Sequence, residues 1–235
     1  MLIAHHLHYT QTCMDALRGI PQKLQNDILE GLQVADQHEM THLASGASIL
    51  NKPMHLVFYE SHFGRLASIH AMAHEDGLPP QDTLAELWMW SEFYQGLALG
   101  EVQISSTARI DKAKVSVSPI FQGHNFIFKS FFDEGSAKRY SRLAIGMYLH
   151  LLHDSFTRSH CVRDAEGNIQ QFLCYRNQSF LEHTARDDVS PRHRKRLLRA
   201  TTEALQALVI DKHRHDPTPL FQLSPQAKPS SNGGI

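Results

Sequence analysis

Apolar residues recur at helical spacing along most of this chain of 235 residues. This spacing runs through residues 10–18, 22–34, 82–97, 136–156, 180–187 and 191–208. Strand-like alternation of β-branched and polar residues is confined to 102–118. The pattern therefore predicts an all-α fold, a single helical domain with at most a short β-ribbon at 102–118.

Residues that start and stop helices divide these segments. Gly19 and Pro21 separate the first two, which predicts a helical hairpin. Asp82 follows two prolines and is the expected N-cap of a helix that Gly100 ends. Ser136 is the expected cap of the long helix that follows. The connections are thus predicted along with the helices.

The domain boundary is expected near residue 212. Residues 1–212 form the predicted helical domain, whereas 213–235 contain several prolines and close on Ser-Ser-Asn-Gly-Gly, a composition typical of disorder. The N-terminus lacks the basic and apolar regions of a cleavable signal, and no stretch has the length and hydropathy of a membrane span. We expect a soluble protein, either cytoplasmic or exported without a cleavable signal peptide.

The charge and the cysteines exclude several classes of protein. A formal net charge of -1 provides no overall field that would attract a polyanion. The three cysteines are an odd number without CxxC spacing, which argues against a disulfide framework and against a thiolate zinc site. Histidine is the unusual component, at 17 residues. Because imidazole is the commonest metal ligand, the positions of the histidines decide the interpretation.

Two histidine–aspartate pairs have the spacing of a chelating helix face. His150 and Asp154 are four residues apart, as are His183 and Asp187, and His160 follows Asp154 by six. Residues four apart on a helix share one face and can bind the same ion. A single such pair is commonly a surface ion pair, but two pairs linked by His160 favour a metal site. Imidazole and carboxylate without thiolate suit zinc, ahead of manganese or iron, at a hydrolytic site.

The order of these residues resembles a known superfamily. The run from His150 to His160 and the later pair His183 and Asp187 match the signature H-x3-D-x5-H followed by H-x3-D or H-x3-E. This signature is similar to that of the zinc-dependent phospholipases C and single-strand nucleases. The resemblance implies a helical fold around a multinuclear zinc cluster, and the aspartate at 187 matches the nuclease branch.

The upstream part of the resemblance is carried by three residues. The family has an aspartate at the end of an early helix and then a histidine in a short motif, and Asp36 and His55 fit this order. It also has a histidine close to the N-terminus. We assign His8 to this position, and the neighbouring His5 and His6 are alternatives. His70 and His74, which are four residues apart, are alternatives to His55.

The resemblance also implies how the ligands are shared among two or three zinc ions per chain. One ion would be held by Asp36, His55, His150 and Asp154, and a second by His160, His183 and Asp187. Asp154 would bridge to a third ion with His8, and Asp36 and Asp154 are the candidate catalytic residues. The family completes its third site with an N-terminal tryptophan, whereas this sequence begins with methionine.

The chemistry expected from such a cluster is hydrolysis of a phosphodiester by a metal-activated water. Phospholipid headgroups, single-stranded nucleic acid and small phosphodiesters all suit it as substrates, and the sequence points to no protein partner. Ser155 and Ser159 lack a G-x-S-x-G elbow, which argues against a serine hydrolase. Two alternatives remain. The first is an HD-type phosphohydrolase with His153 as a ligand, and the second is a non-enzymatic zinc-binding or interaction module.

Overall fold

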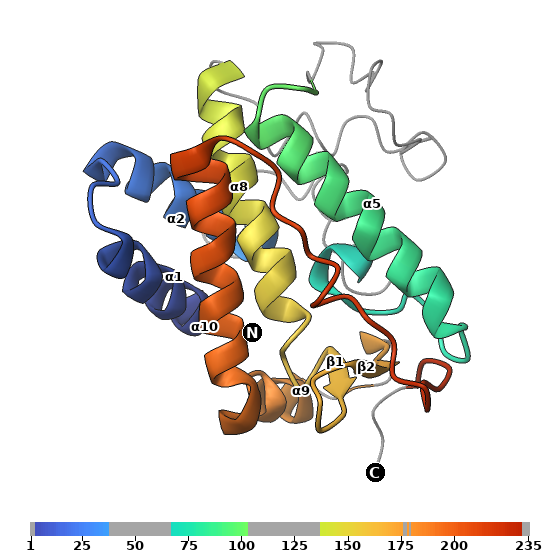
Figure 1. Cartoon of the computed structure of the whole chain (residues 1–235). Coiled ribbons are helices and arrows are strands. Elements are labelled where there is room, and N and C mark those ends of the chain that lie inside the picture. Colours follow the sequence, from blue (N-terminus) through green and yellow to red (C-terminus); the bar gives the residue numbers. More distant parts are fainter. Residues whose placement is uncertain (1–2, 38–66, 103–136, 176–177, 179, 232–235) are drawn as a thin grey trace, which may run out of the picture.

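The computed structural model describes residues 3–37, 67–102, 137–175, 178 and 180–231. Its elements in chain order are α1 (Ile3–Leu17), α2 (Gln22–Gln37), η1 (Ala67–His70), α5 (Pro80–Ala98), α8 (Ala137–Asp154), β1 (Cys161–Arg163), β2 (Ile169–Phe172), α9 (Phe180–Arg186), α10 (Pro191–Leu205) and the π-helix η3 (Gln206–Asp211). The fold is all-α with a short ribbon, as the sequence predicted (Figure 1). Within these ranges, no helix has both the length and the apolar character needed to cross a bilayer.

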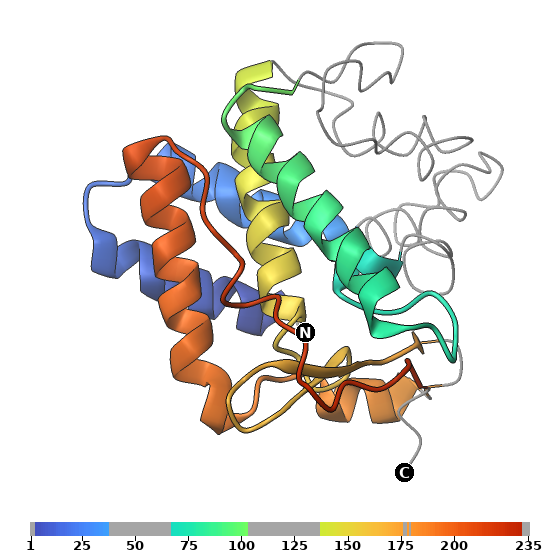
Figure 2. The same ribbon diagram turned by 45° about the vertical axis from the view of Figure 1, so that its right-hand side comes forward.

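Helix α8 runs through the middle of the structure. It is flanked by α2 on one side, by α5 on another and by α10, as both views show (Figures 1 and 2). Every residue from 143 to 157 is buried. A helix that is buried all round needs partners on every face, which explains its central position. The end of this helix therefore delivers its polar residues into the interior.

Two glycines allow α2 and α8 to approach closely. A Cβ atom at Gly146 would lie 2.1 Å from the carbonyl oxygen of Ile28, and one at Gly31 would lie 2.1 Å from that of Leu143. Both atoms belong to backbone, which cannot move aside as a side chain can. This close packing holds the middle of α8 against α2.

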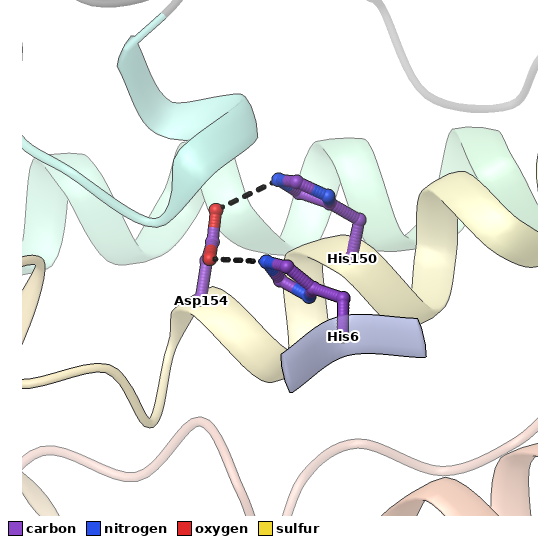
Figure 3. Close-up of side chains that lie close together, drawn as sticks. All are labelled: His6, His150 and Asp154. Atoms are coloured by element: carbon purple, nitrogen blue, oxygen red, sulfur yellow. Dashed lines mark ion pairs between the residues drawn. The ribbon is translucent and has the colours of Figure 1, made fainter. Parts of the chain in front are cut away.

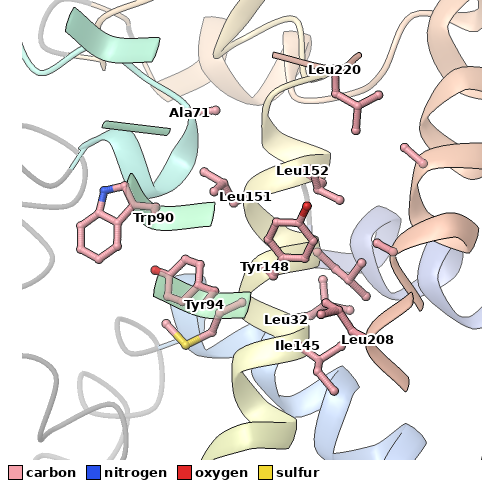
Figure 4. Packing of buried hydrophobic residues seen from close by; sticks show 14 of the residues in the cluster. Leu32, Ala71, Trp90, Tyr94, Ile145, Tyr148, Leu151, Leu152, Leu208 and Leu220 are labelled. Atoms are coloured by element: carbon pink, nitrogen blue, oxygen red, sulfur yellow. The ribbon is translucent and has the colours of Figure 1, made fainter. Parts of the chain in front are cut away.

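The hydrophobic core surrounds α8 (Figure 4). Trp90 and Tyr94 come from α5, Tyr148 and Leu152 from α8, and Leu32 from α2, and all are buried. The Nε1–H of Trp90 donates a hydrogen bond to Ser68 Oγ at 3.0 Å. This bond attaches η1 to α5. The core also includes Tyr9 of α1 and Ile69 of η1, so it holds α1, η1 and α8, which contribute histidines to the site.

The described β-ribbon, formed by β1 and β2, was not predicted from the sequence. β1 and β2 pair antiparallel, with Cys161 opposite Phe172. This hairpin comes shortly after α8. Of the predicted strand region 102–118, only residue 102 lies within the described residues, and it belongs to no strand. The hairpin was missed because its strands are only three and four residues long, too short for alternation to register.

The predicted disorder of 213–235 is wrong for residues 213–231. Leu220 and Phe221 are buried, and the segment pairs with the ribbon through Ile169 N–H to the Gln222 carbonyl oxygen at 2.7 Å. His215 Nδ1 lies 2.7 Å from the hydroxyl of Tyr148. Figure 1 shows this segment crossing the helices toward the ribbon. The prolines of this segment interrupt any helical pattern, so no sign of order was visible in the sequence. They are nevertheless compatible with an extended segment that buries two large side chains.

Candidate metal centre

Histidines from separate parts of the chain converge on Asp154, the last residue of α8. The Nε2 atom of His150, one turn earlier, lies 2.9 Å from Asp154 Oδ2. His70, at the end of η1, places Nδ1 at 3.0 Å from the same oxygen. His6, on α1, places Nε2 at 3.3 Å from the other oxygen, Oδ1 (Figure 3). His160 Nδ1 lies 3.5 Å from Oδ2. A single carboxylate is therefore lined by four imidazole rings.

The burial of this group limits its charge. His6, His70, His150 and Asp154 are each no more than 1% exposed. Burial is the main cause that lowers the pKa of His6 well below its ordinary value, so its ring is neutral. For Asp154, burial alone would raise the pKa, but charges nearby that include His150 and His160 outweigh it and hold the pKa well below its usual range. The carboxylate is thus charged, and one negative charge cannot balance several imidazolium rings.

The spacing of these atoms suits a single ion. Ligands at about 2.0–2.1 Å from a tetrahedral zinc are about 3.3 Å apart. His6 Nε2 to Asp154 Oδ1 is 3.3 Å, and His70 Nδ1 to His150 Nε2 is 3.1 Å. His6 Nε2 is buried and forms no hydrogen bond with any described residue. In the tautomer with hydrogen on Nδ1, the Nε2 lone pair faces the carboxylate, which is repulsive unless a cation such as a metal ion lies between them.

His150 is oriented for binding by its other nitrogen. Nδ1 lies 2.9 Å from the backbone carbonyl oxygen of Leu32 on α2. A carbonyl oxygen only accepts, so Nδ1 carries the hydrogen and Nε2 is left to face Asp154. Metal-binding histidines commonly donate their outer N–H to a carbonyl in this way, which fixes the ring orientation. The close packing of α2 on α8 thus has a direct consequence for the site.

A second group lies beside the first and combines His160, His183 and Asp187. The two Nε2 atoms are 3.4 Å apart, and they lie 3.8 and 4.0 Å from Asp187 Oδ1 respectively. The three ligand atoms lie within 4.8 Å of one another, as do those of His6, His150 and Asp154. Both buried histidine–aspartate groups could hold metal ions.

Outer hydrogen bonds also orient the second group. Gln178 donates its amide N–H groups to the carbonyl oxygens of Ser159 and Cys174, so its Oε1 is left to accept from His183 Nδ1 at 2.9 Å. This bond leaves Nε2 of His183 facing the site. The hydroxyl of Ser159 donates to Asp187 Oδ1 at 2.9 Å. His183 and Asp187 are therefore each oriented by a second contact, as in established metal sites.

The two groups differ in exposure. The side chain of His183 is 11% exposed and that of Asp187 is 9% exposed, whereas His150 and Asp154 are 1% and 0% exposed. His160 joins the groups, because its Nδ1 faces Asp154 and its Nε2 faces His183. The second group is thus the one closer to solvent.

The structure selects His6 among the N-terminal histidines in place of His8. His6 is buried against Asp154, whereas His8 is exposed on the opposite side of α1. Two residues along an α-helix turn the side chain by about 200°, so both cannot face the same site. His5 lies at the rim, with Nδ1 3.6 Å from Asp188 Oδ1. The prediction that His8 lies beside Asp154 was therefore wrong, although another histidine near the N-terminus, His6, does lie there.

The structure describes only some of the other upstream candidates, which are Asp36, His55, His70 and His74. Asp36 lies in α2, but its side chain is outside what the structure describes, and His55 lies outside the described residues altogether. His70, one of the alternatives, contacts both His150 and Asp154. His74 points elsewhere, with Nδ1 3.7 Å from Glu86 Oε1. The positive φ of 53° at Ala71 ends the short helix and turns the chain between these two histidines.

No family model, curated protein or solved structure matches this chain. The geometry of the two groups is therefore the basis for any functional conclusion.

Proposed function

We propose that this protein is a zinc-dependent hydrolase of phosphate esters, and that its substrates are phosphodiesters, as in the phospholipase C and single-strand nuclease superfamily that its sequence resembles. The observation that carries the proposal is the group of His160, His183 and Asp187. Catalytic zinc sites have three protein ligands and one open position, whereas structural sites are closed and rich in thiolate. This group offers three ligands without thiolate and reaches partial exposure at His183.

The residues of the chain have distinct roles in this proposal. When bound, zinc supplies a water activated near neutral pH and positive charge that stabilises a phosphate in the transition state. Asp154 presents both carboxylate oxygens to the histidines around it, which suits a bridging ligand. His160 links the buried group to the partly exposed one. The second group, nearer to solvent, would receive the substrate.

The neighbouring hydroxyl and thiol groups are poorly suited to act as nucleophiles. Ser159 donates its hydroxyl to Asp187, and Ser155 donates its hydroxyl to the Leu152 carbonyl oxygen at 2.7 Å. Burial raises the pKa of the Cys161 thiol to about 11, which keeps it protonated at neutral pH. These contacts favour attack by water over attack by a side chain.

The two alternatives have less support from the geometry. An HD-type phosphohydrolase would need His153 as a ligand, but its Nδ1 lies 3.1 Å from His6 Nδ1 and its Nε2 lies 3.0 Å from Thr201 Oγ1. Both nitrogens of His153 are thus engaged by the side chains of His6 and Thr201. A structural zinc module would favour thiolates, and the cysteines of the described residues lie outside both groups.

Hydrolysis assays with and without chelator test the proposal. We expect purified protein to cleave a chromogenic phosphodiester, to lose this activity in chelator and to regain it with zinc. A phosphatidylcholine-type lipid and single-stranded DNA, assayed in parallel, distinguish the two branches of the superfamily. A zinc-loaded protein that cleaves none of the three would contradict the proposal.

A further inference from the structure

A chain of hydrogen bonds leads from α10 to the metal centre. Thr201, on α10, is fully buried, and its hydroxyl donates to the Leu197 carbonyl oxygen at 2.9 Å. A threonine hydroxyl has a single hydrogen, so while it is donated to Leu197, Thr201 Oγ1 accepts from His153 Nε2, which lies 3.0 Å away. The Nε2 atom of His153 therefore carries the hydrogen.

The next step fixes the hydrogen of His6. His153 is 0% exposed, and complete burial disfavours a charged imidazolium, so the ring is neutral and its Nδ1 has a lone pair. This atom lies 3.1 Å from Nδ1 of His6, and the two ring planes are within 6° of parallel. His6 must donate its Nδ1–H to His153, since two lone pairs at this distance would repel. The Nε2 atom of His6 is then left without hydrogen, facing Asp154 Oδ1.

We propose that His153 is a positioning residue, which, together with Thr201, holds His6 in the tautomer and orientation that bind metal through Nε2. The inference rests on the proposed metal centre for its function, whereas the tautomer follows from the hydrogen bonds alone. The relay joins α10, α8 and α1, and it replaces the usual carbonyl partner of a metal-binding histidine with a second histidine. It also gives His153 a role distinct from that of a ligand.

Substitutions at His153 separate positioning from ligation. In His153→Asn, an amide oxygen can take the place of Nδ1 and accept from His6, whereas His153→Leu fills the volume without an acceptor. We expect His153→Leu to weaken zinc binding by about 10–100-fold, and His153→Asn to restore most of the loss. Zinc affinity by competition with a chromogenic chelator provides the measurement, and circular dichroism confirms that each variant is folded.

Two adjacent threonines provide a matched pair on α10. Thr201 and Thr202 each donate a hydroxyl to the carbonyl four residues earlier at 2.9 Å. Among the described residues, Thr201 Oγ1 lies 3.0 Å from His153 Nε2, whereas the Thr202 hydroxyl bonds to the Leu198 carbonyl oxygen and is not part of the relay. We expect Thr201→Val to weaken zinc binding in the same direction as His153→Leu, and Thr202→Val to leave it unchanged. Equal effects of the two valine variants would overturn the relay.

NMR of the histidine ring nitrogens in metal-free protein tests the tautomer independently of zinc. We expect His6 to be protonated at Nδ1 in the wild type and to lose this preference in His153→Leu. An Nε2-protonated His6 in the wild type would overturn the inference. If the wild type binds zinc and His153→Leu binds it equally well, the positioning role fails while the metal centre stands. A wild type that binds no zinc refutes the proposed function, and the tautomer measurement still decides the relay.

Discussion

The Nε2 atom of His6 and the Oδ1 atom of Asp154 lie 3.3 Å apart, although His6 lies near the start of α1 and Asp154 ends α8. An ion held between them would tie the N-terminal helix to the central one. Because the two residues are distant in sequence, this arrangement exists only in the folded chain. Metal binding and folding should therefore be linked.

The first prediction concerns stability in zinc. We expect the protein to bind at least two zinc ions per chain and to unfold at a higher temperature when they are bound. At free zinc about 100 times the dissociation constant, the gain is about 2.7 kcal/mol for one site. Thermal unfolding with zinc and with chelator, together with metal analysis, measures both quantities. A preparation that stays metal-free in excess zinc would contradict the metal centre.

Asp154→Asn should lose more metal than any other single substitution. Its two carboxylate oxygens face histidines on different elements, so one change weakens contacts to several ligands. Asp188→Asn is the matched control, because Asp188 is about one-third exposed and belongs to neither metal group. Metal analysis after dialysis compares the two variants. Similar losses from both would mean that Asp154 is not a shared ligand.

His183→Ala tests whether the second ion is catalytic or structural. We expect it to abolish phosphodiester cleavage while leaving the helical fold largely intact, since the partly exposed group lies at the edge of the core. His213→Ala, at an exposed histidine, is the control and should keep full activity. Activity and circular dichroism are measured together. Loss of helicity alongside the metal would identify the ion as structural.

The stability of the metal-free protein should fall as the pH decreases from about 6.5 toward about 3. Burial is the main cause that lowers the pKa of His153 and of His183 to about 3, whereas the unfolded chain titrates near 6.5. Between these values the unfolded state binds more protons, so acid favours unfolding by about 1.4 kcal/mol per pH unit for each histidine. Above about pH 7.5 both states are neutral and this dependence disappears.

Urea unfolding at several pH values measures this slope. His153→Asn removes one titrating ring, so it should reduce the slope by about 1.4 kcal/mol per pH unit. A slope identical to that of the wild type would show that His153 is protonated in the folded protein.

Gly146→Ala should destabilise the protein by about 1–3 kcal/mol or more. The new Cβ would lie 2.1 Å from the Ile28 carbonyl oxygen and 2.5 Å from the Leu32 backbone nitrogen, so α2 would have to move away from α8. Lys138→Ala, at an exposed position of α8, should change stability by no more than about 0.5 kcal/mol. Urea unfolding compares the two. A cost no larger than that of the control would contradict the close helix packing.

Much of the fold could be predicted because helical periodicity is a local property. The segment predicted at 22–34 is α2 (Gln22–Gln37), and that at 191–208 contains α10 (Pro191–Leu205). The pairs of the candidate site that share one helix or its continuation were likewise visible, since His150 and Asp154 need only four residues of helix to meet. The packing of 213–231 against the ribbon was not visible, because its contacts are made to distant elements.

The choice between His6 and His8 depended on the phase of α1. That helix was expected to begin at residue 10, but it begins at Ile3, and His6 then falls in line with buried Thr10 and Cys13. A sequence prediction that began this helix at residue 3 would have placed His6, and not His8, on its buried face. The four-residue spacing of His70 and His74 made both of them candidate ligands. The turn after η1 directs His74 away from Asp154, and only the structure shows this turn.

The sequence by itself determined the helical class, the residue types of the candidate metal centre and the pairing of His150 with Asp154 and of His183 with Asp187, because each depends on residue type and on neighbours within a turn. The tertiary structure alone decided which other histidines join them and which groups orient them. The Leu32 carbonyl oxygen and Thr201 have no recognisable sequence signal, since any residue has a carbonyl and a buried threonine serves many purposes. Their roles arise only when α2 and α10 pack against α8, which is a global property of the fold.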